Sequence, residues 1–346
     1  MTSIDIGIFA HNEARAIQNL LRDLSKQSIW ADHSIDARVV VLANGCADDT
    51  AERARATRAG LDETIAGRIE IVELERGGKS RTWNHFTHVA ARKDAELLVF
   101  MDADIGLVQP GALSRMVAAL TERPELVAFN SRPVKDITYH RLKVGPVASV
   151  IERGGGTLYG DLKNGVTGSL YVLRATVARD ISLPIGLPVE DGFVGLMVLS
   201  NLVVGPWRYD RIDADEDVFH VYESIRTIGA LVRHQTRIVI GGVINDVLLE
   251  HMRKEIRKYD HARRYLQDAA RDEGWVTDRV REYLPRAPYG YVSFKWLFWR
   301  LRAAIRARHW ASVMGVLMMG LGFAFDAVVY IDASIKMARG VDEGYW

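Results

Sequence analysis

The first 130 residues alternate between short apolar runs and longer stretches in which apolar residues recur every three or four positions. The short runs, each rich in Val, Ile, Leu or Phe, are IDIGIFA (4–10), ARVVVLAN (37–44), IEIVELE (69–75), ELLVFMD (96–102) and ELVAFNS (125–131). Between them, residues 13–27 and 80–94 have the spacing of amphipathic helices. Strands that alternate with helices predict an α/β fold with a parallel sheet covered on both faces.

Polar or glycine-containing segments follow the predicted strands. In an open parallel sheet, ligands bind in the crevice beyond the carboxyl ends of the strands, so these segments are the first candidates for a site. They are AHNEA (10–14), ANGCADDT (43–50), ERGGKS (75–80) and DADIG (102–106).

Composition narrows the classes of protein that the pattern allows. The chain has 346 residues, enough for two domains or for one domain with an appendage. Its 45 Lys and Arg residues balance 44 Asp and Glu residues, which gives no argument for nucleic acid as a partner. Cys46 is the only cysteine, so an intrachain disulfide and a cysteine-rich zinc site are excluded. The first residues lack the pattern of a signal peptide, and we expect a cytoplasmic catalytic part.

The stretch LLVFMDADIG (97–106) fits two enzyme classes. P-loop NTPases end a buried strand with a magnesium-binding Asp, and GGKS (77–80) resembles part of their phosphate loop. That loop requires G-x-x-x-x-G-K-[ST], but the position of its first Gly is occupied by Glu73, inside a predicted strand. The P-loop interpretation therefore remains as the weaker alternative. The other class, nucleotide-sugar transferases, uses Asp-x-Asp to hold a divalent ion against a diphosphate.

Taken in order, the four segments resemble the signatures of the family 2 glycosyltransferases. AHNEA resembles the P-x-Y/H-N-E element, ANGCADDT the D-D-G-S-T-D-G-T turn, ERGGKSRTWN the G-K-x-x-A-L-N segment and DAD the metal-binding Asp-x-Asp. Downstream, VEDGFVG (189–195) resembles the family's E-D pair, and RHQTRI (233–238) resembles its Q-x-x-R-W element with Ile238 in place of Trp. The resemblance implies the GT-A fold, a Rossmann-like and mostly parallel sheet.

The resemblance also implies an inverting, metal-dependent transfer from a nucleotide sugar. A divalent ion would neutralise the charge that develops on the departing diphosphate, and oxygen ligands favour Mn²⁺ or Mg²⁺. Asp104 is the expected direct ligand, while Asp102 either shares the metal or contacts the ribose. His220 is a candidate third ligand, with a structural histidine as the alternative.

The acceptor requires a base that removes the proton of its attacking hydroxyl. Asp191 is the candidate, and Glu190 is expected to orient Asp191 or to hold an acceptor hydroxyl. Inversion would give a β-linkage from an α-linked donor. The alternative is that the pair only caps the helix that follows it.

Other candidate contacts come from the same segments. The residues expected to bind the donor are Ala10, Asn12, Glu13, Asn44, Lys79 and Asp102, and those expected to contact the acceptor or the diphosphate are Gln235 and Arg237. A solvated Lys79 and helix capping by Asn12 and Glu13 are the alternatives. The family commonly carries acids where this chain has Ala43-Asn44, so the base of the donor, in UDP or GDP, is left open.

After residue 245 the sequence becomes charge-rich with a helical pattern. This change predicts a catalytic domain over 1–245 and a helical region over 246–346. Within the second part, 294–331 is expected to associate with a membrane, because aromatic and basic residues precede an apolar stretch, 311–331, that is long enough to span a bilayer. Asp326 opposes simple spanning, which favours an in-plane or re-entrant anchor, or a span with Asp326 near one interface.

We therefore expect a hexosyltransferase at the cytoplasmic face of the cell membrane, peripheral or anchored, that acts on a lipid-linked or membrane-proximal acceptor in glycolipid or polysaccharide synthesis. The alternatives are a P-loop-like NTPase and a nucleotide-sugar-binding protein without turnover. If the apolar stretch does not meet lipid, it is core or the interface of a homo-oligomer.

Overall fold

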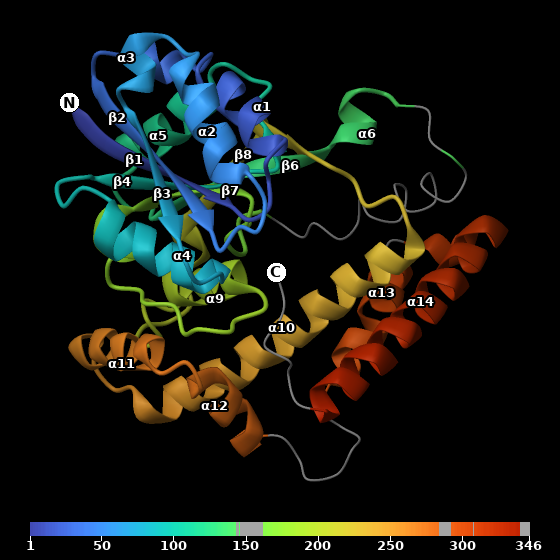
Figure 1. The fold of residues 1–346 in the computed structure, drawn as a ribbon. Helices are drawn as coiled ribbons and strands as arrows, with labels where there is room; N and C mark the ends of the chain where they lie inside the picture. Colours follow the sequence, from blue (N-terminus) through green and yellow to red (C-terminus); the bar gives the residue numbers. More distant parts are fainter. Residues whose placement is uncertain (143–144, 146–161, 284–291, 307, 340–346) are drawn as a thin grey trace.

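The computed structural model describes residues 1–142, 145, 162–283, 292–306 and 308–339. Its first part is a sheet with helices on both faces, and its last part is entirely helical in the described residues (Figure 1). The strands are β1 (Thr2–Ala10), β2 (Ile35–Asn44), β3 (Ile69–Leu74), β4 (Leu97–Asp102), β5 (Ile105–Gly106), β6 (Ala128–Lys135), β7 (Leu170–Arg174) and β8 (Ile212–Tyr222). They form one sheet in the order β3-β2-β1-β4-β7-β6-β8-β5.

The half of the sheet that comes first in the chain is parallel, and the other half is mixed. β3, β2, β1 and β4 pair in parallel, β7 runs antiparallel to both β4 and β6, and β6 pairs in parallel with β8. The predicted strands are all present, although the run at 125–131 becomes a strand only from Ala128. The prediction of an α/β fold with a mostly parallel sheet is confirmed.

Each face of the sheet carries its own hydrophobic core. Along β1, Ile4, Ile6 and Ile8 face a core that contains α1 (Ala16–Leu24) and α5 (Ala112–Glu122), as the period of two in a strand requires. The other face packs against α4 (Lys79–His85), α9 (Glu190–Leu199) and α10 (Ile228–Glu255). The smaller helices are α2 (Thr50–Ala59), α3 (Glu63–Ala66), α6 (Asp136–Tyr139), α8 (Ala175–Ala178) and a π-helical turn at Phe86–Ala90.

The long helix α10 connects the sheet part to the rest of the chain. It begins at Ile228, so the expected domain boundary at residue 245 falls inside it. The remaining helices are α11 (Tyr259–Arg271), α12 (Trp275–Tyr283), α13 (Phe294–Arg306) and α14 (Val313–Ala338). Figure 1 shows α11 and α12 at one end of α10, below the sheet, and α13 and α14 beside its other end. Residues 284–291, whose two prolines predict a break between helices, lie outside the described residues.

Two adjacent glycines allow α10 to approach its neighbours closely. A Cβ atom on Gly241 would lie 2.3 Å from Val189 Cγ2, and one on Gly242 would lie 2.4 Å from the Trp296 ring. Any side chain at these positions would force the neighbours apart. The glycines therefore let α10 contact the segment before α9 on one side and α13 on another.

Candidate active site

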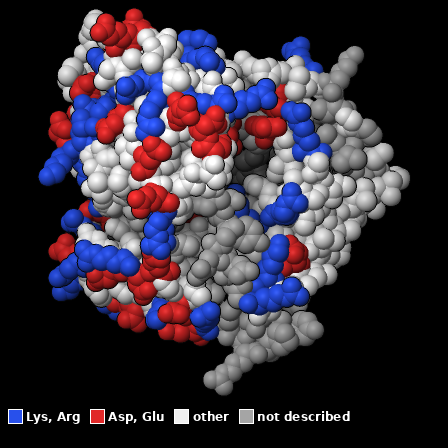
Figure 2. All heavy atoms as spheres, viewed as in Figure 1, with Lys and Arg blue, Asp and Glu red and all other residues white. Residues whose placement is uncertain are grey.

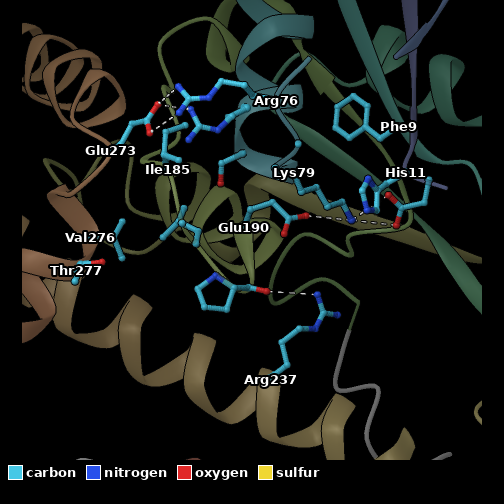
Figure 3. A pocket seen from close by; sticks show the side chains of 18 of the residues that line it. Phe9, His11, Arg76, Lys79, Ile185, Glu190, Arg237, Glu273, Val276 and Thr277 are labelled. Carbon is cyan, nitrogen blue, oxygen red and sulfur yellow. Dashed lines mark hydrogen bonds and ion pairs between the residues drawn. The ribbon is translucent and has the colours of Figure 1, made fainter. Parts of the chain in front are cut away.

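The carboxyl ends of the parallel strands border a cavity of about 640 Å³. The expected residues among its lining are Glu13, Lys79, Asp102, Asp104, Glu190 and Arg237. Figure 3 shows this cavity from close by, with Phe9 and His11 at one end, Arg76 and Glu273 at the other, and Lys79 and Glu190 between them. Segments that are far apart in the sequence thus meet where the sheet topology predicts a ligand site.

The loops after β1 and β2 are bound to each other. Asn12 has a φ of 56° and its Oδ1 accepts a hydrogen bond from the Ala47 backbone N–H at 2.7 Å, while the Glu13 N–H donates to Thr50 Oγ1 at 2.8 Å. Asn44 is buried, and its carbonyl oxygen lies 2.7 Å from Nδ1 of the histidine that precedes Asn12. Ala10, like Asn12 and Asn44, is not among the cavity-lining residues. The Asn12 side chain and the Asn44 backbone carbonyl therefore hold the two loops together.

The loop after β3 approaches the loop after β2 through glycines. Gly45 has a φ of +55°, and a Cβ atom there would lie 2.6 Å from the backbone nitrogen of Gly77. Only glycine combines this left-handed conformation with so close a contact. The contact positions the Gly77–Gly78 turn and, directly after it, Lys79 at the cavity.

Lys79, which follows β3, forms ion pairs with two acids from distant parts of the chain. Its Nζ lies 3.0 Å from Asp102 Oδ1, 3.1 Å from Asp102 Oδ2 and 3.1 Å from Glu190 Oε1. These dashed contacts are visible in Figure 3. The alternative of a solvated Lys79 does not describe this arrangement, because the side chain is only 22% exposed and both of its ion-pair partners line the cavity.

The cavity lining contains five acidic and five basic side chains, and burial raises the pKa values of two of the acids. Burial raises the pKa of Glu13 to about 7, with a further contribution from Asp104. Burial also raises the pKa of Asp102 to about 7, against the opposing effect of Lys79. Burial alone would lower the pKa of Lys79, but Asp102 and Glu190 outweigh it and hold that pKa well above its ordinary value. The neighbouring carboxylates of Asp102 and Asp104 offer oxygen ligands of the kind that suit a divalent cation.

The E-D pair occupies the first turn of α9. Glu190 is buried and lines the cavity, whereas Asp191 is not among the lining residues. Asp191 Oδ1 accepts a hydrogen bond from the Gly192 N–H at 2.8 Å within this turn. The helix-capping alternative does not describe the pair, because α9 begins at Glu190 and its N-cap, Val189, makes no side-chain capping hydrogen bond. Its Oδ2 faces Gly168, where an added Cβ would lie 2.6 Å away. Burial and the charge of Glu190 raise the pKa of Asp191 to about 6, although Lys79 opposes them.

α10 supports this pair from below. Asn245 Nδ2 donates a hydrogen bond to the Val189 carbonyl oxygen at 3.1 Å, and Arg237 Nη1 donates to the Pro188 carbonyl oxygen at 3.4 Å. Arg237 lines the cavity, but Gln235 does not: its Oε1 accepts a hydrogen bond from Arg300 Nη2 of α13 at 2.9 Å. The two residues of the Q-x-R segment therefore point into different environments.

His220 lies in β8 and away from the cavity lining. It is fully buried, its Nδ1 lies 2.9 Å from Ser131 Oγ, and burial lowers its pKa to about 3. In the described part of the chain, no three His, Cys, Asp or Glu residues are grouped closely enough to hold a metal ion by themselves. The oxygens of a bound diphosphate would have to complete a metal site built on Asp102 and Asp104.

Several lining residues were not expected from the sequence. From the strand ends these are Phe9, His11, Arg76 and Arg81, and from the segment that includes α12 they are Glu273, Val276, Thr277, Val280 and Arg281. Arg76 and Arg81 flank the G-K segment, so their position in the motif was a signal for them. The α12 residues lie in a charged amphipathic segment without a motif, and only the tertiary fold brings them to the cavity.

Comparisons with known proteins agree with the fold and identify the family. The solved structure of mannosyltransferase PcManGT from Pyrobaculum calidifontis, in complex with GDP-Man and Mn²⁺, has a TM-score of 0.55 at 17% identity, over 96% of this chain and 86% of that chain. Glucosyl-3-phosphoglycerate synthase from Mycobacterium tuberculosis, in complex with Mg²⁺ and UDP, has a TM-score of 0.47 at 18% identity, over 70% and 79% of the two chains. No curated protein matches the sequence. The family model described as glycosyl transferase family 2 matches residues 5–177, half of the chain, and the protein therefore belongs to that family.

Proposed function

We propose that the protein is an inverting, metal-dependent glycosyltransferase that moves a sugar from UDP or GDP to a hydroxyl of a lipid-linked or membrane-proximal acceptor. The observation that carries this proposal is the cavity at the strand ends, where Lys79 bridges Asp102 and Glu190 beside Asp104. The site thus combines carboxylates for a metal, a cation for the diphosphate and an acid pair for the acceptor.

The metal in this proposal is Mn²⁺ or Mg²⁺, held by Asp104 and Asp102. Lys79 already contacts both oxygens of Asp102, which supports Asp104 as the more available ligand. When bound, the ion would neutralise charge on the departing nucleoside diphosphate. The similar mannosyltransferase fold is complexed with GDP-Man and Mn²⁺, in agreement with this assignment.

The chain's own groups then serve the transfer. The acceptor oxygen attacks the anomeric carbon, the bond from that carbon to the diphosphate breaks, and the acceptor proton passes to a carboxylate. We assign the proton to Asp191, with Glu190 and Lys79 orienting the reacting groups. Gly168 leaves room for the Asp191 carboxylate, and α10 fixes the turn that carries it.

The apolar surface of α13 and α14 supports the membrane-proximal acceptor. Figure 2 shows few charged side chains on the outer side of these helices. Exposed residues on them include Phe294, Trp299, Ile305, Val313, Met314, Leu317 and Leu321. Within the described residues, α14 is the helix whose length and composition suit a membrane crossing. Core helices of soluble proteins share this property, but they are mostly buried. Only 11% of the most apolar 18-residue segment of α14 is buried.

A central charge in α14 is neutralised inside the protein. Asp326 is 3% exposed and pairs with Arg300 of α13, which lessens the cost of bringing α14 into lipid. We therefore propose that α13 and α14 together attach the enzyme to the cytoplasmic face of the membrane, either at its surface or as an anchor.

The test is a transfer assay with UDP- and GDP-sugars, Mn²⁺ and a detergent extract of membrane lipids. The proposal expects a labelled β-linked product in the organic phase, dependent on one of these donors. Hydrolysis of ATP that requires Lys79, without any use of sugar nucleotides, would support the NTPase alternative. Tight binding of a nucleotide sugar without hydrolysis or transfer to any extract would support a binding protein.

A further inference from the structure

Two arginines at one end of the cavity converge on a single carboxylate. Arg76 Nη1 and Arg81 Nη1 each lie 2.8 Å from Glu273 Oε1, and Arg76 Nη2 lies 3.5 Å from Glu273 Oε2. The arginines flank the Gly77–Gly78 turn, whereas Glu273 comes from the turn between α11 and α12, almost 200 positions later in the chain. This contact joins the turn between α11 and α12 to the loop after β3 at the cavity.

The geometry is that of a site for an anion. A guanidinium presents a planar set of N–H donors that matches the oxygens of a carboxylate or a phosphate, and two of them here share one oxygen. Without Glu273, the two positive groups would face each other across the mouth of the cavity with no acceptor between them. Glu273, 47% exposed, can leave for water at little cost when another anion takes its place.

The position of the arginines favours the acceptor over the donor. In Figure 3, Arg76 lies at the end of the cavity opposite Phe9 and His11, with Lys79 and Glu190 between. If the nucleoside occupies the Phe9 end and the diphosphate approaches the Asp102–Asp104 strand end, the arginines lie beyond the reacting centre. Apolar side chains of α12, Val276 and Val280, line the same cavity and suit an aliphatic part of the acceptor.

We propose that Arg76 and Arg81 form a subsite for a phosphate or carboxylate group of the acceptor, and that Glu273 occupies this subsite until the acceptor displaces it. The inference rests on the proposed function, because it takes the cavity to be a transferase site. The acceptor is thereby an anionic molecule, either a small phosphate ester or a lipid whose headgroup bears a phosphate.

The direct test measures binding of inorganic phosphate to the full-length protein by calorimetry, at constant ionic strength. Glu273→Gln removes the competing charge but keeps the size of the side chain, and it should raise the affinity for phosphate about tenfold, since a charge-assisted contact no longer competes. Glu273→Ala should act in the same direction. Arg81→Gln in the Glu273→Gln background should abolish the gain.

The control is Asp268→Asn on α11, which removes a carboxylate that is 75% exposed and pairs with Arg271. It should leave phosphate binding unchanged. Equal phosphate affinity in wild type and in both Glu273 variants, with native circular dichroism, would overturn the subsite and leave Glu273 as a clamp between two parts of the chain.

Two further arms separate the alternatives. Saturating UDP or GDP with Mn²⁺ should leave phosphate binding to the Glu273→Gln variant intact, and displacement of phosphate would assign the arginines to the donor and overturn the proposal. Glycerol 3-phosphate and a long-chain lipid phosphate in micelles then distinguish the two sources. If binding of one of these two compounds depends on Arg81, the subsite is supported and the source is identified. If binding of neither compound depends on Arg81, the subsite is contradicted. Failure of the transferase function itself would instead be seen as loss of nucleotide binding.

Discussion

Lys79 is the only cation that contacts both Asp102 and Glu190 among the described residues, and it therefore determines the charge state of the site. It keeps two carboxylates close together that would otherwise repel each other. Burial, with smaller contributions from neighbouring acids, raises the pKa values of Glu13 and Asp102 to about 7. A divalent metal would bring positive charge to this cluster, and the diphosphate of a donor would bring negative charge. Because the two charges compensate each other, one site can hold both.

Substitution of Asp191 tests the base at the scale of one residue. Asp191→Asn should reduce kcat on the order of 10²–10⁴-fold, because an amide cannot take the acceptor proton. Donor affinity, measured by calorimetry, should change little. The carboxylate has a pKa of about 6 and acts when deprotonated, so the ratio of wild-type to variant kcat should fall as pH decreases below about 6 and level off above it. Activity of Asp191→Asn within a few-fold of wild type would place the base elsewhere.

Much of the site could be predicted at this scale because strand ends carry short, ordered motifs. Asp102, Asp104 and Lys79 meet in one cavity because the order of parallel strands places their ends at one edge. Glu190 joins them from the start of α9, and its motif was the signal for it. Asn44 could not be placed in the same way, since its side chain is buried under the loop that it supports.

At the scale of elements, α10 connects the two halves of the molecule. Its Asn245 supports the turn before α9, and its Gln235 contacts Arg300 of α13. The sequence predicts the charged and apolar helices of the last hundred residues, but the pairing of α10 with α9, α12, α13 and α14 depends on contacts across long separations. Gly241 and Gly242, which permit two of these contacts, have no local pattern that distinguishes them from other glycines.

The pair between Arg300 and Asp326 tests how α13 and α14 are held together. Both side chains are mostly buried, so Asp326→Ala should cost about 3–5 kcal/mol of local stability, because it leaves a buried arginine without its counter-ion. The measurement is limited proteolysis of the C-terminal helices against denaturant. Arg300→Leu combined with Asp326→Leu should recover most of that loss.

An exposed ion pair of the same region supplies the control. Lys295 and Asp246 are 50% and 55% exposed, and Asp246→Ala should cost under about 1 kcal/mol. Equal losses for Asp246→Ala and Asp326→Ala would show that burial of the pair does not determine how these helices are held.

At the scale of the whole molecule, the structure divides into a polar catalytic part and an apolar helical end (Figures 1 and 2). α14 has 26 residues and is about 39 Å long at 1.5 Å per residue, more than the roughly 30 Å of a bilayer core. The apolar run at 311–331 predicts a helix long enough to span a bilayer, and α14 extends further, to Ala338. Its orientation could not be predicted, since it depends on the contacts of α14 with α10 and α13.

Membrane attachment is tested without disturbing the fold by placing charges on exposed positions of α14. Leu317 and Leu321 are 58% and 63% exposed, and Leu317→Asp combined with Leu321→Asp should abolish sedimentation with anionic liposomes. Val89→Asp, at an exposed apolar position of the catalytic part, should sediment as the wild type does. A wild-type protein that ignores liposomes and forms a dimer that the double variant lacks would assign the surface to self-association.

The most direct test of the central claim is calorimetric titration of the full-length protein with UDP- and GDP-sugars, in MnCl₂ and in excess EDTA. The metal-dependent donor site predicts measurable binding of one of these donors with Mn²⁺, and binding at least tenfold weaker, about 1.4 kcal/mol, in EDTA. Asp104→Ala should lose the effect of the metal while keeping native circular dichroism. Equal affinity for the donor with Mn²⁺ and with EDTA, or an unchanged metal effect in Asp104→Ala, would contradict the assignment of this site.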